Sequence, residues 1–362
     1  MRHISIHVLL ASALSVGVTC AADNIKWLGT EYDFGTIREE SGKAHGQVRF
    51  VNLGPEATMI QRVKSTCGCT GVGFTEGVIA PGDTATVWFD YDPTGRPGRF
   101  EKHVKAYTGV NNDLTSITLK GTVIGAPHSL DSKYPVVNGG LRLSADVIPL
   151  GKTTWGTSRH KYIYGYNQSA DTLSLSWKDV PRFVSLGVSS RSVAPGDLFT
   201  VSAYLNTRDG AEIGSLDAPF TLIAEGADGA VSLPVHITAD IVPDISAYTD
   251  EQLREAPSAT LYPTLLELGE VRGDKHIKQE FFLRNEGKTP LALKRVHCPQ
   301  FPSLIKTKSM PRSLKPGESK PIKLNINPDV LPKGIFKIAV EVVTDDPLHP
   351  TRNVHLIGTR PE

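Results

Sequence analysis

The chain has 362 residues, of which 40% are hydrophobic and 21% charged, a composition typical of soluble globular proteins. This length suits about three domains of ordinary size. The 39 Lys and Arg balance the 38 Asp and Glu, so the formal net charge is +1, which argues against nucleic acid and anionic membrane as general partners.

Residues 1–22 are typical of a secretory signal peptide. Arg2 supplies positive charge, the apolar core that follows is too short to span a bilayer comfortably, and small residues precede Asp23. The alternatives are an uncleaved anchor and lipid attachment at Cys20. No later segment is long and apolar enough to cross a membrane. We therefore expect an exported chain in a compartment where thiols oxidise.

Three stretches of about 100 residues then repeat one pattern, as expected of duplicated domains. Each opens on a glycine motif, reaches a Pro-Gly turn about 45 residues later and closes on an alternating apolar segment. The openings read DFGTI, PLGKT and ELGEV, and the turns read IAPGD, VAPGD and LKPGE. Three matches in register predict three copies of one module.

The apolar residues of each copy recur with a period of two, in short segments separated by Gly, Pro, Asn and Asp. This pattern predicts antiparallel strands in a sandwich. In the first copy, the residues expected to face the core are Val48, Phe50, Val87 and Phe89. Those expected to face water are Gln47, Arg49 and Thr86. We expect an all-β chain of three tandem immunoglobulin-like β-sandwich domains, at residues 24–125, 135–243 and 258–361.

Two linkers separate the copies. The first, residues 124–140, contains turn formers and no sustained period. The second, residues 242–258, contains DEQLRE, which favours one or two helical turns. Both are suited to semi-rigid hinges.

These motifs resemble a known family. The first copy, with FGTI, STCGCT, IAPGDTATVWFDYDPTGRPGRF and ITLKGTV, resembles the bacterial DUF1573 domain, an immunoglobulin-like domain of unknown function in exported proteins. The third copy, with LRNEG and TDDPLHPTRNVHLIGT, is similar to the related ASPM–SPD-2–Hydin domains. The resemblance implies the fold and an address in the periplasm or at the surface of a Gram-negative bacterium. It implies no reaction.

Cys67 and Cys69 flank one glycine, and Cys298 aligns with the same loop in the third copy. Four interpretations stay open at this stage. The cysteines are buried packing groups, or Cys67 and Cys69 form a local disulfide that serves as a clip or a redox device. Alternatively the pair binds Cu(I) with help from His45, Met59 or His103, or a cysteine pairs between chains or domains, for example with Cys298.

No catalytic motif is present in the sequence, and no metal or cofactor is expected. The four tryptophans are expected to pack in cores or at sheet edges. We expect a non-enzymatic binding or scaffolding protein of the bacterial envelope, which recognises an envelope protein or a glycan through end loops or edge strands. The alternative is a thiol-redox or Cu(I)-binding protein that uses Cys67 and Cys69.

Overall fold

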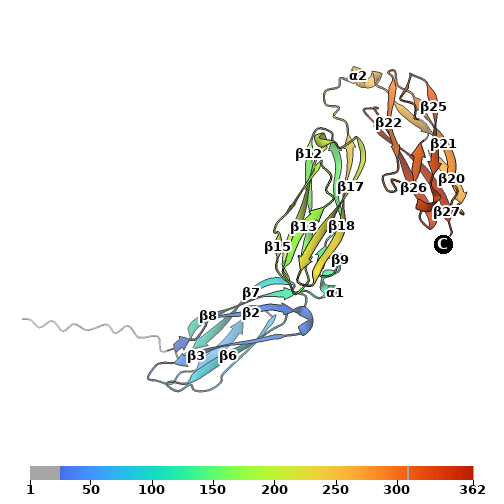
Figure 1. Cartoon of the computed structure of the whole chain (residues 1–362). Coiled ribbons are helices and arrows are strands. Elements are labelled where there is room, and N and C mark those ends of the chain that lie inside the picture. Colours follow the sequence, from blue (N-terminus) through green and yellow to red (C-terminus); the bar gives the residue numbers. More distant parts are fainter. Residues whose placement is uncertain (1–24, 308–309, 362) are drawn as a thin grey trace, which may run out of the picture. The chain divides into compact units, whose positions relative to one another are not determined.

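The computed structural model describes residues 25–307 and 310–361, and within them the chain forms three β-sandwiches (Figure 1). One compact unit ends at Val123, and a second unit, which holds two of the sandwiches, begins at Ile124. The expected signal peptide and Cys20 lie outside the described residues. Within the described residues, no helix is long and apolar enough to cross a membrane.

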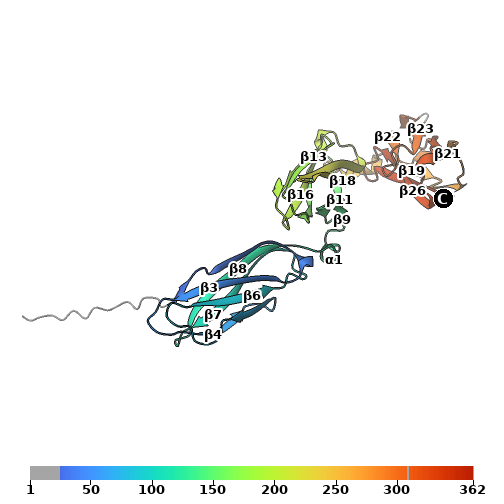
Figure 2. The same ribbon diagram turned by 60° about the horizontal axis from the view of Figure 1, so that its bottom comes forward.

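The first sandwich contains β1 (Ile25–Trp27), β2 (Glu31–Arg38), the 3-10 helix η1 (Glu39–Ser41), β3 (Ala44–Asn52), β4 (Ile60–Ser65), β5 (Thr70–Phe74), β6 (Thr84–Tyr91), β7 (Gly98–Thr108) and β8 (Asp113–Ile124). One sheet has the order β1-β3-β6-β5 and the other β2-β8-β7-β4. Figure 2 shows β3 and β6 side by side, and they pair in antiparallel register.

The second sandwich contains α1 (Pro127–Leu130), β9 (Val136–Asn138), β10 (Leu141–Leu143), β11 (Val147–Thr154), β12 (Ser158–Asn167), β13 (Leu173–Lys178), β14 (Val184–Val188), β15 (Ser192–Val193), β16 (Leu198–Asn206), η2 (Thr207–Asp209), β17 (Gly214–Gly226) and β18 (Gly229–Val242). Its sheets have the orders β14-β16-β12-β10-β9 and β11-β18-β17-β13-β15.

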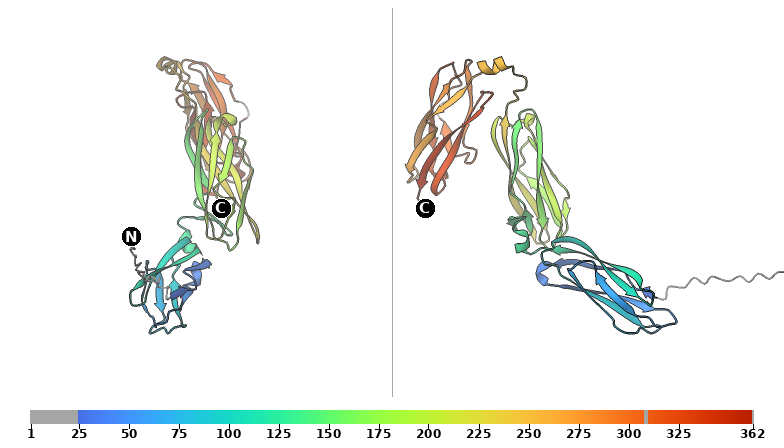
Figure 3. Two further views of the ribbon diagram at one scale, coloured as in Figure 1. Left: turned by 90° about the vertical axis from the view of Figure 1, so that its left-hand side faces the viewer. Right: turned by 180° about the vertical axis from the view of Figure 1, so that it is seen from behind.

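The third sandwich follows α2 (Asp250–Glu255), the short coil in Figure 3 that confirms the helical turns expected of DEQLRE. Its elements are β19 (Ala259–Tyr262), β20 (Leu265–Glu270), β21 (Ile277–Asn285), β22 (Leu291–His297), β23 (Ile305–Thr307), β24 (Ser313–Leu314), β25 (Ser319–Ile326), η3 (Pro328–Val330), β26 (Gly334–Thr344) and β27 (Thr351–Arg360). The sheets have the orders β19-β21-β25-β23 and β20-β27-β26-β22-β24.

The three tandem immunoglobulin-like sandwiches confirm the expected fold class. In the first, the four residues expected in the core are buried, whereas Gln47 and Arg49 are exposed and Thr86 is half-buried. Each sandwich has its own apolar core, because its alternating residues meet between its own two sheets. The strands fall inside the ranges 24–125, 135–243 and 258–361, but the domain boundaries themselves stay predictions.

In each sandwich a buried asparagine is the last residue of one strand and connects it to two loops. These residues are Asn52 of β3, Asn167 of β12 and Asn285 of β21. Asn52 donates through its side-chain amide to the carbonyls of Glu56 and Ile79, at 2.8 and 3.0 Å, and its side-chain oxygen accepts a backbone N–H. Asn167 and Asn285 repeat this pattern. All three asparagines are fully buried, so their side-chain amides find their hydrogen-bond partners in the protein and not in water.

The same asparagine anchors the Pro-Gly turn. The N–H of Gly82 donates to the carbonyl of Asn52 at 2.8 Å, and Gly82 has a φ of +83°. That conformation is strained for any other residue, which explains why the sequence repeats glycine there. Gly196 and Gly317 make the same bond to Asn167 and Asn285.

The first linker is held to the second sandwich by a buried arginine. The Arg142 side chain is only 4% exposed. It donates to the Asp131 carboxylate at 2.9 Å, to the Tyr134 carbonyl at 3.2 Å and to the Gln168 side chain at 2.6 Å. Buried charge is tolerated where it is paired in this way. Residues 131–134 of the linker are therefore fixed to the sandwich that follows them.

A buried carboxylate links the two sandwiches of the second unit. Glu341 on β26 is 3% exposed and accepts hydrogen bonds from the N–H of Ser215 on β17, at 3.0 and 3.2 Å, and from its hydroxyl. His297 lies 3.6 Å from the same carboxylate. Burial, assisted by the charge of Arg295, lowers the pKa of His297, which favours the neutral ring.

Candidate functional site

The turn with Cys67 and Cys69 carries the chain from one sheet of the first sandwich to the other. β4 ends one strand order and β5 ends the other, so the turn joins two edge strands. The N–H of Thr66 donates to the carbonyl of His103 at 3.0 Å, and the N–H of Asp92 donates to the carbonyl of Cys69 at 2.9 Å. Only Cys67 and Gly68 thus lie between the two ladders, which makes the crossing very tight.

In the structure the Sγ atoms of Cys67 and Cys69 are bonded to each other. Of the four interpretations that the sequence leaves open, the arrangement of these two sulfurs matches the local disulfide. The Ser65 hydroxyl donates to the carbonyl of Cys67 at 2.9 Å and fixes the start of the turn. The Thr70 hydroxyl lies 3.5 Å from the sulfur of Cys67 and 3.8 Å from that of Cys69, so it can donate to either.

The two sulfurs differ in burial. Cys69 is 6% exposed and packs in a small cluster with Tyr91 and Val123, whereas Cys67 is only half-buried at its margin. Tyr91 stacks on Phe100 with ring centroids 4.0 Å apart. The Tyr91 hydroxyl has no hydrogen-bond partner among the described residues, and burial raises its pKa. Because Cys67 is less buried than Cys69, a reagent in solution can reach Cys67 more readily.

The edge strand β5 begins directly after the disulfide. Its sequence TGVGF has no charge and no proline, the devices that commonly protect edge strands from pairing with another chain. A Cβ added at Gly73 would lie 2.2 Å from the indole nitrogen of Trp88, so the Trp88 ring covers the glycine. Trp88 is 45% exposed. β5 is thus a narrow, uncharged edge beside an accessible indole.

The tryptophans correct one expectation from the sequence. Trp27 packs on Phe50 with ring centroids 4.9 Å apart, and Trp177 packs against the second core. Trp88 and Trp155 are instead 45% and 47% exposed. Trp88 occupies an outward strand position, and Gly73, opposite it on β5, gives its ring a place to lie on the sheet surface.

The other sandwiches cross between their sheets at the corresponding place without a disulfide. In the second, residues 179–183 join β13 to β14, and Asp179 takes a φ of +61°. In the third, Cys298 follows β22 and is fully buried in the core, and it forms no disulfide within the described residues. Burial raises the pKa of the Cys298 thiol. Cys298 therefore occupies the related loop as an inert packing group.

The histidines considered as helpers of the cysteines have other partners. Nδ1 of His45 lies 2.6 Å from Oδ1 of Asp90, and Nε2 of His103 lies 3.6 Å from Oε1 of Glu101. In residues 25–307 and 310–361, no group of three or more His, Cys, Asp and Glu is arranged to hold a metal ion. The structure does not bring a ligand set together at the sulfurs.

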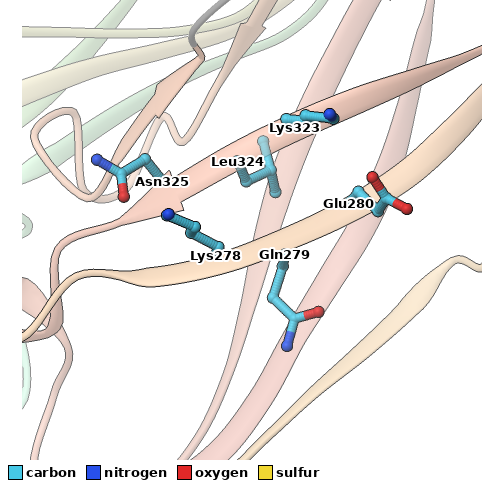
Figure 4. Close-up of a pocket in the computed structure, with 6 residues that line it drawn as sticks. All are labelled: Lys278, Gln279, Glu280, Lys323, Leu324 and Asn325. Atoms are coloured by element: carbon cyan, nitrogen blue, oxygen red, sulfur yellow. The ribbon is translucent and has the colours of Figure 1, made fainter.

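A shallow hollow of about 470 Å³ lies on β21 and β25 of the third sandwich. Figure 4 shows its lining residues: Lys278, Gln279, Glu280, Lys323, Leu324 and Asn325. Both signs of charge are present, and the side chains lie along the sheet instead of converging on one point. The hollow therefore offers no arrangement for acid–base or nucleophilic catalysis.

These features define the class as a tandem array of immunoglobulin-like sandwiches, one of which has a disulfide at the crossing between its sheets. Residues 25–123, which form the first sandwich, match the family model of DUF1573, described as a protein of unknown function. This match confirms the resemblance identified from the sequence. No match is found among the curated proteins.

Solved structures are similar to the chain to different extents. A protein of unknown function from Porphyromonas gingivalis has a TM-score of 0.50 at 19% identity, over 61% of this chain and 100% of that one. An I-band fragment of titin has a TM-score of 0.24 at 10% identity, over 94% and 100%. The PapD-like domain of human CEP192 has a TM-score of 0.26 at 12% identity, over 34% and 99%. At 19% identity, the likeness to the Porphyromonas gingivalis protein concerns the fold alone.

Proposed function

We propose that this chain is a non-enzymatic binding or scaffolding protein of the bacterial envelope, and that it captures an envelope protein by strand addition to β5. The partner's segment would continue the sheet β1-β3-β6-β5 through main-chain hydrogen bonds. Its side chains would contact the exposed indole of Trp88.

The observation that supports this proposal is the unprotected edge of β5 next to the disulfide. Four of its five residues are half-buried or exposed, and none is charged. The edge strand β4, by contrast, carries Arg62 and Lys64, and β1 carries Lys26. The bonded turn fixes where β5 starts, so a partner strand would meet a rigid edge and lose less conformational entropy on binding.

The test is capture of envelope proteins from a bacterial extract by the mature chain and by a Gly71→Lys variant. A Cβ at Gly71 would lie 3.7 Å from the nearest atom of Asp90, an ordinary contact, so the lysine fits without disturbing the fold. A charged edge residue opposes strand addition. We expect the variant to lose the partner that the unaltered chain captures.

The matched control is Gly187→Lys on β14, the corresponding edge strand of the second sandwich. A Cβ there has its nearest neighbour 4.0 Å away, at Tyr204. This variant should capture the partner normally. Equal capture by all three chains would contradict recognition through β5.

A second candidate function is thiol–disulfide exchange, which is favoured by the unequal burial of the two sulfurs. The thiolate of a dithiol donor would attack Sγ of Cys67, the Cys67–Cys69 bond would break, and Cys69 would leave as a thiolate near the Thr70 hydroxyl. The donor's second thiolate would then release Cys67, so that the donor is oxidised and the pair is reduced. The small ring would make the bond easy to reduce.

Mass spectrometry after alkylation measures this exchange in mixtures of reduced and oxidised dithiol. Exchange through Cys67 predicts that Cys69→Ser accumulates a mixed disulfide with the donor at Cys67, whereas Cys67→Ser forms much less at Cys69. Equal trapping at both cysteines, or a bond that resists reduction, would contradict a redox function.

A further inference from the structure

The outer face of β12 and β16 in the second sandwich is unusually rich in exposed tyrosine. We call it the tyrosine face and define it by His160, Tyr162, Tyr164, Thr200, Ser202 and Tyr204. In the register of the sheet, His160 lies opposite Tyr204, Tyr162 opposite Ser202, and Tyr164 opposite Thr200. The three tyrosines are 52%, 48% and 50% exposed, in chain order.

The rings of the tyrosine face are arranged in two pairs. Those of Tyr162 and Tyr164 meet edge to face with centroids 5.3 Å apart, and their hydroxyls are 3.5 Å apart. The His160 ring stacks on Tyr204 with centroids 5.4 Å apart. Each ring is thereby steadied by a neighbour while half of its surface stays in water, so little side-chain freedom is left to lose on binding.

The tyrosine face has no carboxylate, ammonium or guanidinium group. The next pairs along the register are Ser158 with Asn206 and Tyr166 with Leu198, which are also uncharged. Beyond them, Arg142 of β10 lies opposite Tyr166, but its side chain is buried and paired with Asp131. Ser185 and Gly187 of β14 lie opposite Tyr204 and Ser202. Exposed strand positions usually carry charge, so an uncharged surface of rings and hydroxyls is unusual for a merely solvated face.

The same face in the other two copies provides an internal comparison. On β3 and β6 of the first sandwich, His45 pairs with Asp90, and Arg49 lies opposite Thr86. On β21 and β25 of the third, Glu280 lies opposite Lys323. This face therefore has charged residues in the first and third sandwiches, whereas the second has tyrosine and hydroxyl groups there.

We propose that the tyrosine face binds a neutral polysaccharide. A sugar ring has an apolar face of C–H groups that stacks on the electron-rich face of an aromatic ring, and hydroxyls around its rim that pair with tyrosine, serine and threonine. The six residues of the tyrosine face include no Lys or Arg that could neutralise the charge of an anionic polymer. A flat sheet face, unlike an enclosed pocket, accommodates a chain of sugars along the strands.

The experiment is native gel electrophoresis of the mature chain through gels that contain a neutral glucan, mannan or xylan, or the anionic polymer alginate. At least one neutral polymer should retard the protein, and alginate should not. Replacing both rings with Tyr162→Ala and Tyr164→Ala should weaken the binding by about tenfold or more. The matched Tyr162→Phe and Tyr164→Phe variant keeps the rings and should retain most of the retardation.

A Trp88→Ala variant, which removes an exposed ring of the first sandwich, serves as the control for loss of aromatic surface in general and should bind like the unaltered chain. Circular dichroism of each variant verifies that the fold is kept. The proposal is overturned if no neutral polymer retards the protein, if alginate retards it equally, or if the double alanine variant binds undiminished. Gly71→Lys should leave this binding intact, so the two proposals fail independently.

Discussion

The side-chain amide of Asn52 donates to the carbonyl of Ile79 across 3.0 Å, between residues 27 positions apart in the sequence. This bond connects the end of β3 to the loop before the Pro-Gly turn. The corresponding bonds from Asn167 to Val193 and from Asn285 to Leu314 are 2.9 and 3.1 Å long. One polar side chain thus fixes the same corner in all three sandwiches.

The first prediction concerns this corner. Asn52→Ala removes the two bonds that the amide donates and the one that its oxygen accepts from the N–H of Gly54, all at a fully buried position. We therefore expect the free energy of unfolding of the first sandwich to fall by about 3 kcal/mol. Denaturant unfolding followed by tryptophan fluorescence measures the change. Gln47→Ala, an exposed change on the same strand, should alter the stability by less than about 0.5 kcal/mol. Similar losses in both variants would contradict the role of the corner.

The second prediction concerns the linker that Arg142 holds. Arg142→Met should free residues 131–134, because it removes the donors to Asp131, Gln168 and the carbonyl of Tyr134. We expect faster proteolysis at residues 125–135 and a loss of about 2 kcal/mol from the second sandwich. Mass spectrometry of the first cleavage products locates the cut.

Asp131→Asn is the control for this experiment. The Asp131 side chain is 65% exposed, so its charge contributes little beyond the hydrogen bond. Proteolysis of this variant should resemble that of the unaltered chain. If both variants are cut equally fast, the buried arginine does not anchor the linker.

The alternation and the repeated turns were sufficient to predict the fold, because burial on one face of a strand requires a period of two. The Pro-Gly turns, and the Gly, Pro, Asn and Asp residues that separate the apolar segments, predicted where strands end. They did not predict that the asparagine amide donates to two distant carbonyls. Those bonds depend on how the two sheets of each sandwich bring distant loops next to the asparagine. The repeated Asn at positions 52, 167 and 285 was the available signal.

The candidate site was predictable only in part. The spacing of Cys67 and Cys69 permitted a local disulfide, but a two-residue spacing does not indicate which residues surround the sulfurs. The exposure of Trp88 depends on Gly73 of the neighbouring strand, which is 15 residues away in sequence. The tyrosine face likewise required the register between β12 and β16, since one strand alone shows only that alternate residues are aromatic.

The third prediction is a pH dependence that arises from Cys298. Burial raises the pKa of its thiol in the folded protein. Above about pH 8.5, the ordinary thiol pKa, the unfolded chain loses this proton while the folded chain keeps it. The free energy of unfolding of the third sandwich should therefore fall as the pH rises from about 8.5.

Unfolding of the unaltered chain and of Cys298→Ala at pH 7.5 and 10 isolates this contribution, since the other titrating groups are common to both. The unaltered chain should lose more stability than the variant over this interval. Iodoacetamide should also label Cys298 only after unfolding. Rapid labelling of the folded protein would show that the thiol is accessible, contrary to its burial.

The last prediction separates the stabilising role of the Cys67–Cys69 bond from its role in function. A ring closed over so few residues restricts the unfolded chain only slightly, so Cys67→Ser with Cys69→Ser should lower the free energy of unfolding of the first sandwich by about 1.5 kcal/mol. A reductant should lower the stability of the unaltered chain by a similar amount and leave the double variant unchanged. The second and third sandwiches, which have no such bond in the described residues, serve as internal controls. If the double variant instead lowered the free energy of unfolding by more than about 4 kcal/mol, the sulfurs would act mainly as packing groups against Tyr91. A loss of that size is expected when substitutions leave a cavity in the core.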